Sequence, residues 1–292
     1  MELRDIALAT TALVAIAALA TPASAGGYMG KINLGGGFAW ENYDYGSEGS
    51  SDNNYSTMHG SGSVNVPYND RVNLQFDIFG AESLDNQGGE SGNSFYGGFG
   101  AGAHINYRDP AMGALGVFAA VGRANGSSSW ATDTVVFAAG LEGEYYCNAW
   151  TLRAQAGYLD SDSNGGYLVQ QAGFVLAGAN YYASKKLKLS GEVGYLDGAT
   201  SATDAASDVT EWNWAFTIEY MFGQSVPVST YLEYRGQASE TYDSPSYDVD
   251  RHALNVGVRF YFGGDGDLQK ADREGAGSSS PDILTWSRRN TD

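Results

Sequence analysis

The sequence predicts an all-β fold: a transmembrane antiparallel up-and-down β-barrel of about twelve strands, with ten or fourteen strands as alternatives. Two observations carry this prediction. Apolar and polar residues alternate along segments that recur through most of the chain, and the connections between those segments alternate between short and long. A third observation excludes helices as membrane-crossing elements, because no segment beyond the N-terminus approaches the run of about 18 apolar residues that a spanning helix needs.

Residues 1–25 have the pattern of a secretory signal peptide. The apolar run Ile6–Ala20 is too short for a comfortable transmembrane helix, and the Ala-Ser-Ala at 23–25 supplies a small-x-small cleavage site. The segment before the run holds one arginine and two acidic residues, which departs from the usual basic start, and a buried N-terminal helix is the alternative. We expect cleavage after residue 25, so that the barrel domain covers 26–262.

Twelve segments show a period of two. In WNWAFTIEYMF, at 212–222, every second residue is aromatic or aliphatic, and the residues between are mostly polar or small. Such alternation is typical of strands with one apolar and one polar face, and several segments exceed the usual strand length of about 5–6 residues. The eighth segment is the least regular, because Leu168, Phe174 and Leu176 fall on its polar face. The predicted strands are 29–40, 57–66, 72–80, 94–107, 114–123, 133–146, 150–159, 167–182, 186–196, 210–222, 226–238 and 250–262.

The connections between these strands sort by length and by charge. Strict alternation places all the long loops at one end of the barrel, where they hold fifteen Asp and Glu and no Lys or Arg. The short side carries Arg71, Arg108 and Lys185. Transmembrane barrels have short periplasmic turns and longer outer loops, so we expect the acidic loops on the outer side. The short connections are 67–71, 108–113, 147–149, 183–185 and 223–225; the long loops are 41–56, 81–93, 124–132, 160–166, 197–209 and 239–249.

The polar face of the strands carries charges in mid-strand, which a tightly packed soluble core would not tolerate. A water-filled lumen would accommodate them, with lipid against the apolar face, and a sheet in lipid must close because lipid offers its edges no hydrogen bonds. Aromatic residues cluster at both ends of the apolar face, as expected for girdles at the two lipid–water boundaries. By this parity the pore-lining residues are Lys31, Asp77, Glu142, Arg153, Lys188, Glu192, Glu219, Glu233, Arg235 and Arg259.

The lumen charges have two interpretations. One is a polar track for small hydrophilic solutes, and the other is a ladder of salt bridges that braces or closes a narrow barrel. Twelve strands lie between small filled barrels and the 16–18-stranded porins. The small inward residues of the fourth and fifth strands predict free space along one wall and favour the track. These residues are Gly98, Gly100, Gly102, Gly116 and Ala120.

The last predicted strand ends in Asn255, Gly257, Phe260 and Phe262 at a characteristic spacing. This pattern resembles the C-terminal β-signal of bacterial outer-membrane barrel proteins. The resemblance covers residues 1–262 and implies lipid-facing aromatics, recognition by the barrel-assembly machinery, and a place in the outer membrane of a Gram-negative bacterium.

The pattern departs from that family in position, because residues 263–292 follow it. We therefore predict an internal assembly signal and a periplasmic C-terminal tail, with both chain termini periplasmic. The tail is rich in Gly, Ser, Asp and Arg and is expected to be disordered. The alternative is a segment that docks in the periplasmic mouth or on a partner, with Trp286 as its anchor.

Composition limits the other classes of function. The formal net charge of −18 argues against nucleic-acid binding. The single cysteine, Cys147, allows no intrachain disulfide, and three scattered histidines predict no metal site or cofactor. His59 and Ser61 share the lumen face and are interpreted as a polar pair. We therefore predict no enzyme, although a barrel enzyme remains a remote alternative.

The sequence thus predicts a small porin-like channel for small hydrophilic solutes, and the alternative is a structural or surface-interaction barrel with a lumen closed by salt bridges. The acidic loops predict a preference for cations at low ionic strength, because their field extends about 8 Å at physiological salt. Their carboxylates also suit divalent cations that bridge to lipopolysaccharide phosphates. Expected partners are therefore outer-membrane lipid, lipopolysaccharide and the assembly machinery.

Overall fold

The structure is a computed structural model, and the predicted signal peptide lies outside the residues that it describes. The described residues are 27–44, 46, 49–84, 97–125, 134–162, 169–200, 208–222, 227–241 and 247–286.

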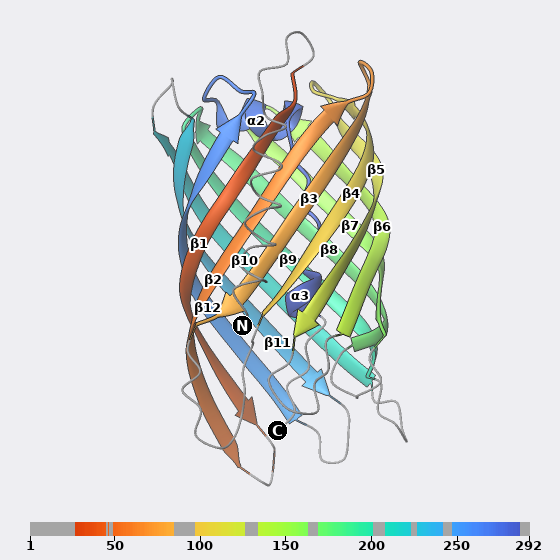
Figure 1. The fold of residues 1–292 in the computed structure, drawn as a ribbon, viewed down its shortest axis with the longest axis vertical. Helices are drawn as coiled ribbons and strands as arrows, with labels where there is room; N and C mark the ends of the chain where they lie inside the picture. Colours follow the sequence, from red (N-terminus) through yellow and green to blue (C-terminus); the bar gives the residue numbers. More distant parts are fainter. Residues whose placement is uncertain are drawn as a thin grey trace.

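Twelve antiparallel strands form a closed barrel in which each strand pairs with its neighbours in the chain and β1 pairs with β12 (Figure 1). The predicted fold class and strand number are confirmed. The strands are β1 Met29–Asp44, β2 Ser50–Pro67, β3 Val72–Ser83, β4 Gly97–Asp109, β5 Gly113–Asn125, β6 Thr134–Cys147, β7 Trp150–Ser161, β8 Val169–Ser184, β9 Leu187–Thr200, β10 Asp208–Phe222, β11 Val228–Thr241 and β12 Tyr247–Phe262.

Most strands extend further toward the loop end of the barrel than the alternation predicts. The predicted long loop 41–56 is mostly strand, because the ladder between β1 and β2 continues to the pair Asp44–Ser50. The connections therefore alternate in length less strictly than expected: 45–49 at the loop end and 223–227 at the turn end both have five residues. The predicted strands are too short because backbone pairing continues past the apolar band. Beyond that band the side chains are polar, so the sequence no longer alternates in hydrophobicity.

The outer face of the barrel is apolar. Side chains such as Leu34, Phe216 and Val256 point outward and remain about half exposed, while their chain neighbours point inward. Aromatic residues lie exposed near both strand ends, among them Trp212 toward the loops and Tyr220 toward the turns. This arrangement suits lipid outside and polar groups inside. No helix among the described residues is long and apolar enough to cross a membrane.

The seam between β1 and β12 is built on glycines. The Phe262 ring lies where a Cβ on Gly30 would be, and Asn255 occupies the same position relative to Gly37. Each glycine thus makes room for a residue of the predicted assembly signal. Phe260 pairs with Ile32 and is exposed on the outer face.

Gly257 adds to the seam from the inner face. It pairs with Gly35, and the Tyr231 side chain lies over both. The Arg259 guanidinium stacks 4.4 Å from the centre of the Tyr231 ring, which is within the range of a cation–π contact. The signal residues therefore lie where the barrel closes, and their recognition by an assembly machinery stays a prediction.

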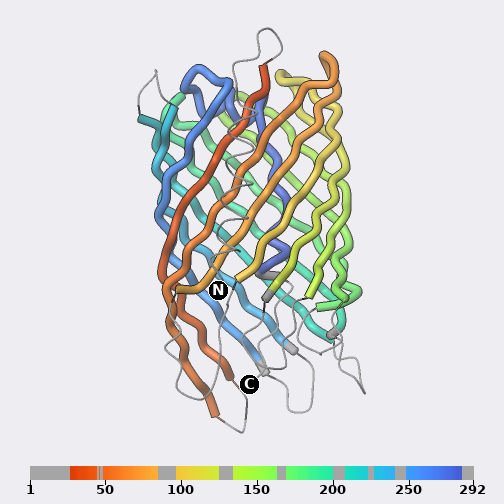
Figure 2. Tube along the Cα trace, viewed as in Figure 1, coloured from red at the N-terminus to blue at the C-terminus, as the bar shows by residue number. Residues whose placement is uncertain are grey.

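The expectation of a disordered tail is wrong for residues 263–286, which we call the tail. Its backbone turns at Gly263 and Gly266, where φ is 77° and 81°, and enters the barrel. It then forms the short helix α2 (Leu268–Glu274), an extended segment, and one helical turn, α3 (Ile283–Trp286). Figure 2 shows the tail inside the barrel, descending from the turn end toward the loop end.

The same path corrects the predicted position of the C-terminal region. Residues 27–28 and Phe262 lie at the turn end, as expected, but α3 lies in the loop half of the lumen (Figure 1). There Leu284 contacts the strands beside Gly98 and Gly122, both near the loop ends of β4 and β5. The tail therefore runs along the lumen instead of extending from the turn end.

Candidate functional site

The tail occupies the turn end of the lumen with α2. Leu268 is fully buried against Tyr182, Met221 and Tyr261, which point inward near the turn ends of their strands. Asp272 accepts hydrogen bonds from Lys188 Nζ at 3.0 Å and from Tyr182 Oη at 2.8 Å. Arg273 adds hydrogen bonds to the carbonyls of Asn148 and Trp150, at 2.9 and 2.7 Å. This end is thus held by apolar packing, a buried ion pair and hydrogen bonds to the turn.

The middle of the tail is held mainly through its backbone. Arg108 Nη1 donates to the Gly275 carbonyl at 2.5 Å, Gln75 Nε2 to the Ser278 carbonyl at 2.8 Å, and Gln155 Nε2 to the Ser279 carbonyl at 2.9 Å. Asp77 Oδ2 accepts from both the backbone N–H and the hydroxyl of Ser280, at 2.9 and 3.0 Å. The inner face of the barrel therefore binds an extended peptide of small residues.

The far end of the tail is held by apolar packing. Ile283 and Leu284 are buried in a cluster with Phe174 and Leu176 of β8 and with neighbours on β5–β7, β9 and β10. The irregular polarity of the eighth segment now has a physical reason, because Phe174 and Leu176 point into the lumen as expected but belong to a buried apolar cluster that includes Ile283 and Leu284 of α3. Leu168 lies outside the described residues.

The small residues of β4 and β5 face the inside of the barrel, as predicted, but the free space expected beside them is filled. Added Cβ atoms at Gly98 and Gly102 would meet Leu284 and Ser280 of the tail, and one at Gly100 would meet the Phe79 ring. Asn106 covers Gly116, and Ala120 belongs to the cluster around α3. These small residues therefore make room for the tail and for neighbouring side chains, which sequence parity could not distinguish from an opening.

His104 lies in a buried acidic pair. Its Nδ1 faces both carboxylate oxygens of Glu142 at 2.9 Å, and its Nε2 faces Asp77 at 3.0 Å and Ser280 Oγ at 3.3 Å. The arrangement has the residue types of a hydrolytic triad, but both ring nitrogens face carboxylates and the Ser280 hydroxyl donates to Asp77. Without a free ring nitrogen the imidazole has no acceptor for a serine proton. The group ties the tail to the wall.

A second charged group spans β9, β10 and β12. Glu219 is fully buried and pairs with Lys188 at 2.9 Å and Arg259 at 2.5 Å. Ser229 and Tyr261 donate to the same carboxylate at 2.6 and 2.5 Å. Each charge is thus compensated by pairing and hydrogen bonding, as buried charges require.

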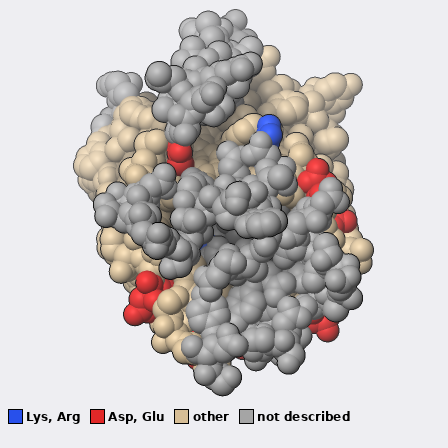
Figure 3. Space-filling view, turned by 60° about the horizontal axis from the view of Figure 1, so that its bottom comes forward, with Lys and Arg blue, Asp and Glu red and all other residues tan. Residues whose placement is uncertain are grey.

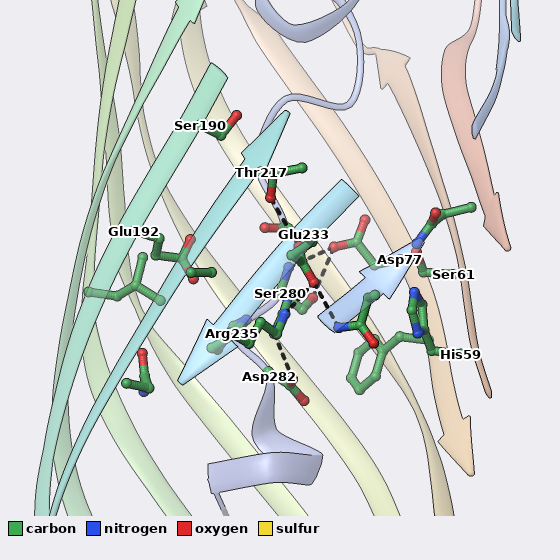
Figure 4. Close-up of a pocket in the computed structure, with 18 of the residues that line it drawn as sticks. His59, Ser61, Asp77, Ser190, Glu192, Thr217, Glu233, Arg235, Ser280 and Asp282 are labelled. Carbon is green, nitrogen blue, oxygen red and sulfur yellow. Dashed lines mark hydrogen bonds and ion pairs between the residues drawn. The ribbon is translucent and has the colours of Figure 1, made fainter. Parts of the chain in front are cut away.

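A cavity of about 400 Å³ remains beside the tail. Side chains of β1–β3 and β6–β12 line it, and the tail forms its remaining side. Figure 4 shows His59, Ser61 and Glu192 around this space, with Arg235 joined to Asp282 of the tail. Nine of the ten residues predicted to line a pore border the cavity, and the tenth, Glu219, is buried in the wall.

Several wall atoms under the tail find no protein partner. Among the described residues, Asn65 Oδ1, Gln75 Oε1, Asn106 Nδ2 and both Nε and Nη2 of Arg108 are buried without a hydrogen bond. Each such group costs about 1–3 kcal/mol when it is left unsatisfied. The tail therefore fits the wall incompletely along its middle section.

The loop end carries acidic groups on its rim. Asp248 lies in register between Glu240 on one side and Asp44 on the other. Figure 3 views this end and shows Asp and Glu at several places around the rim, with little Lys or Arg. Within the described part of the chain, no group of three or more His, Cys, Asp and Glu is placed to hold a metal ion.

The ionisation of Asp272 couples α2 to pH. Burial raises its pKa, but Lys188 and Lys31 outweigh burial and hold the pKa below the ordinary value of 3.8. A depressed acid pKa stabilises the docked form above the ordinary pKa, and that contribution is lost as the pH falls through the docked-state pKa.

We therefore expect the amides of 268–274 to lose protection from hydrogen exchange below about pH 4, after correction for intrinsic exchange rates. Asp272→Asn should lower protection at neutral pH and remove the dependence on pH, because the ion pair with Lys188 is then absent. Equal protection of α2 at pH 3 and pH 6 in the unmodified protein would contradict this assignment.

No protein-family model matches the sequence, and no curated protein matches it. Solved structures do share the architecture. An outer membrane channel from Pseudomonas putida F1 aligns with 82% of this chain and 96% of its own, at 11% identity and a TM-score of 0.53. The translocator domain of the autotransporter NalP from Neisseria meningitidis aligns with 88% and 95%, at 14% identity and a TM-score of 0.47. The outer membrane protease OmpT from Escherichia coli aligns with 80% and 96%, at 10% identity and a TM-score of 0.35.

The closed antiparallel barrel, the apolar outer face, the polar lumen and the similarity to the P. putida channel define the fold class. The chain has the fold of the bacterial outer-membrane β-barrels. At such low identity this likeness establishes architecture, and the same fold serves unrelated functions.

Proposed function

We propose that the protein is a narrow outer-membrane channel for small hydrophilic solutes, whose lumen is partly filled by its own tail. The observation that carries the proposal is the cavity of about 400 Å³, which is lined by charged and polar side chains from most strands of the barrel. A wall of this composition favours water and polar solutes over apolar ones. The acidic rim adds a preference for cations to the proposal.

The second candidate is a structural or surface-interaction barrel. The compensated charges around Glu219 and the apolar cluster around α3 favour it, because both fill part of the lumen. The two candidates differ in one measurable property, which is the passage of ions through the protein.

Filling the cavity should reduce ion flow. Ser61 borders the cavity, whereas Met58 on the same strand is exposed on the outer face. We expect Ser61→Trp to lower the single-channel conductance in planar bilayers several-fold, because the indole occupies space that water and ions use.

Met58→Trp is the matched control, since it adds the same ring on the lipid side. Its conductance should equal that of the unmodified protein. A conductance that is insensitive to Ser61→Trp would place the ion path elsewhere, and the absence of any current would favour the structural barrel.

A further inference from the structure

We propose that the tail is a displaceable plug: the inner face of the barrel is a peptide-binding site, residues 268–286 are its resident ligand, and their departure opens the channel. This inference rests on the proposed function for its consequence, but the displacement itself can be measured separately.

The tail is attached to the barrel outside the strand ladders, through contacts that can break and form again. No tail residue takes part in the strand ladders, and the barrel closes through β1 and β12 without it. Within the described residues, one hydrogen bond joins a backbone group of the tail to a backbone group of the barrel, from the Leu268 N–H to the Lys185 carbonyl at 2.8 Å. The tail can therefore leave without breaking a ladder.

The polar contacts of the middle section favour exchange with water. Arg108, Gln75 and Gln155 donate to backbone carbonyls of Gly275, Ser278 and Ser279. Water can replace each of these bonds on both partners when the lumen fills, so the net loss is small for the two glutamine bonds and larger for the charged Arg108.

The poor fit of the wall points in the same direction. Asn65, Gln75, Asn106 and Arg108 each keep a buried polar atom without a protein partner while the tail is in place. Hydration of these atoms becomes possible when the tail leaves, which offsets part of the contacts that are lost. A permanent filling would be expected to satisfy such groups or to face apolar residues.

Two ion pairs between the tail and inward-facing side chains have the same property. Asp272 pairs with Lys188, and Asp282 pairs with Arg235 across the cavity. After departure of the tail, Lys188 keeps Glu219 and Arg235 keeps Glu233, at 2.9 and 2.6 Å. Neither cation is left uncompensated in an open lumen.

The plug is held at its far end by the apolar contact of α3. Ile283 and Leu284 are 0% and 2% exposed, against the small residues Gly98 and Gly122. When they leave, the cavity joins the space along β4 and β5, because the side-chain atoms nearest to an added Cβ at Gly98, Gly102 or Gly122 all belong to the tail. The size of the opening therefore depends on this segment.

A disulfide can test the proposal in the full-length protein. An added Cβ at Gly102 would lie 3.2 Å from the Ser280 Cβ, close to the separation of about 3.5–4.5 Å found in disulfides. In a Cys147→Ser background, which removes the exposed native thiol, Gly102→Cys with Ser280→Cys should form a bond that locks the tail. Oxidised protein should stay at a low conductance in planar bilayers, and reduction should restore transitions to a higher level.

A second variant releases the plug instead of locking it. Ile283→Asp with Leu284→Asp places two carboxylates in an apolar cluster, so we expect the tail to leave about tenfold more often or more. Displacement is read, again in the Cys147→Ser background, from the rate at which an impermeant maleimide labels Ser278→Cys in proteoliposomes, because Ser278 is 6% exposed when docked. Gly264→Asp is the control: it adds a carboxylate at an exposed position of the tail that does not border the cavity, and it should change neither labelling nor conductance.

The outcomes separate the two proposals. Two results overturn the plug. One is failure of the 102–280 disulfide to form, and the other is equal conductance and equal labelling in the locked, reduced and Asp-substituted proteins. In either case the channel proposal still depends on whether the protein conducts ions. Faster labelling with no current in any variant supports a displaceable tail and overturns the channel. Faster labelling together with more time at the higher conductance supports both.

Discussion

Replacing Glu219 with alanine is expected to lower the free energy of unfolding by about 3–5 kcal/mol, because it leaves two buried cations with one fewer counter-charge. Glu219 is fully buried, and Lys188 and Arg259 both pair with it. Arg259 loses its ion-pair partner, while Lys188 keeps Asp272. Ser229 and Tyr261 also lose the acceptor for their hydroxyls.

A urea titration in lipid vesicles measures this effect. Asp265→Ala is the matched control, since it removes an exposed ion pair with Lys270 and should change stability little. A loss below about 1 kcal/mol for Glu219→Ala would mean that water reaches Lys188 and Arg259 and compensates their charges. That result would contradict the burial of this charged group.

Phe262→Ser should lower the amount of barrel in the outer membrane several-fold and increase periplasmic degradation. The Phe262 ring packs over Gly30 at the seam where β1 meets β12, so its loss weakens the step that closes the barrel. Removing residues 263–292 should leave assembly intact, because the tail takes part in no strand ladder.

Phe216→Ser separates assembly from simple loss of apolar area. Phe216 is 49% exposed on the outer face of β10, away from the seam. Equal losses for Phe216→Ser and Phe262→Ser would remove the special role of Phe262. Assembly that survives Phe262→Ser but fails on removal of 263–292 would place the signal in the tail.

The strands and the inward residues could be predicted because side chains alternate along a strand, and because the outer face of the barrel suits lipid while the inner face is polar. Parity alone puts Glu219, Lys188 and Arg259 on the inner face. It could not show that these residues meet, because their meeting depends on strand register, which places Lys188 opposite Glu219 on the neighbouring strand, and on the reach of Arg259 across β11. The loop boundaries were missed for a related reason, since polar strand ends pair by their backbone alone.

The tail could not be predicted from its own composition. Its Gly and Ser residues are bound through backbone groups, which every sequence has, so they leave no pattern and resemble a disordered segment. The available signal was a complementary one. Phe174 and Leu176 were apolar on a polar face, and Ile283 and Leu284 were apolar in a polar tail; the structure brings these four together.

The ion current through purified full-length protein in a planar bilayer tests directly whether an aqueous path runs beside the tail. We expect discrete current steps that Ser61→Trp reduces and that Met58→Trp leaves unchanged. The steps should stay at their low level while the 102–280 disulfide is oxidised. The contradicting result is a bilayer without current steps. It counts when faster maleimide labelling of Ser278→Cys shows that the protein is inserted and its tail displaced.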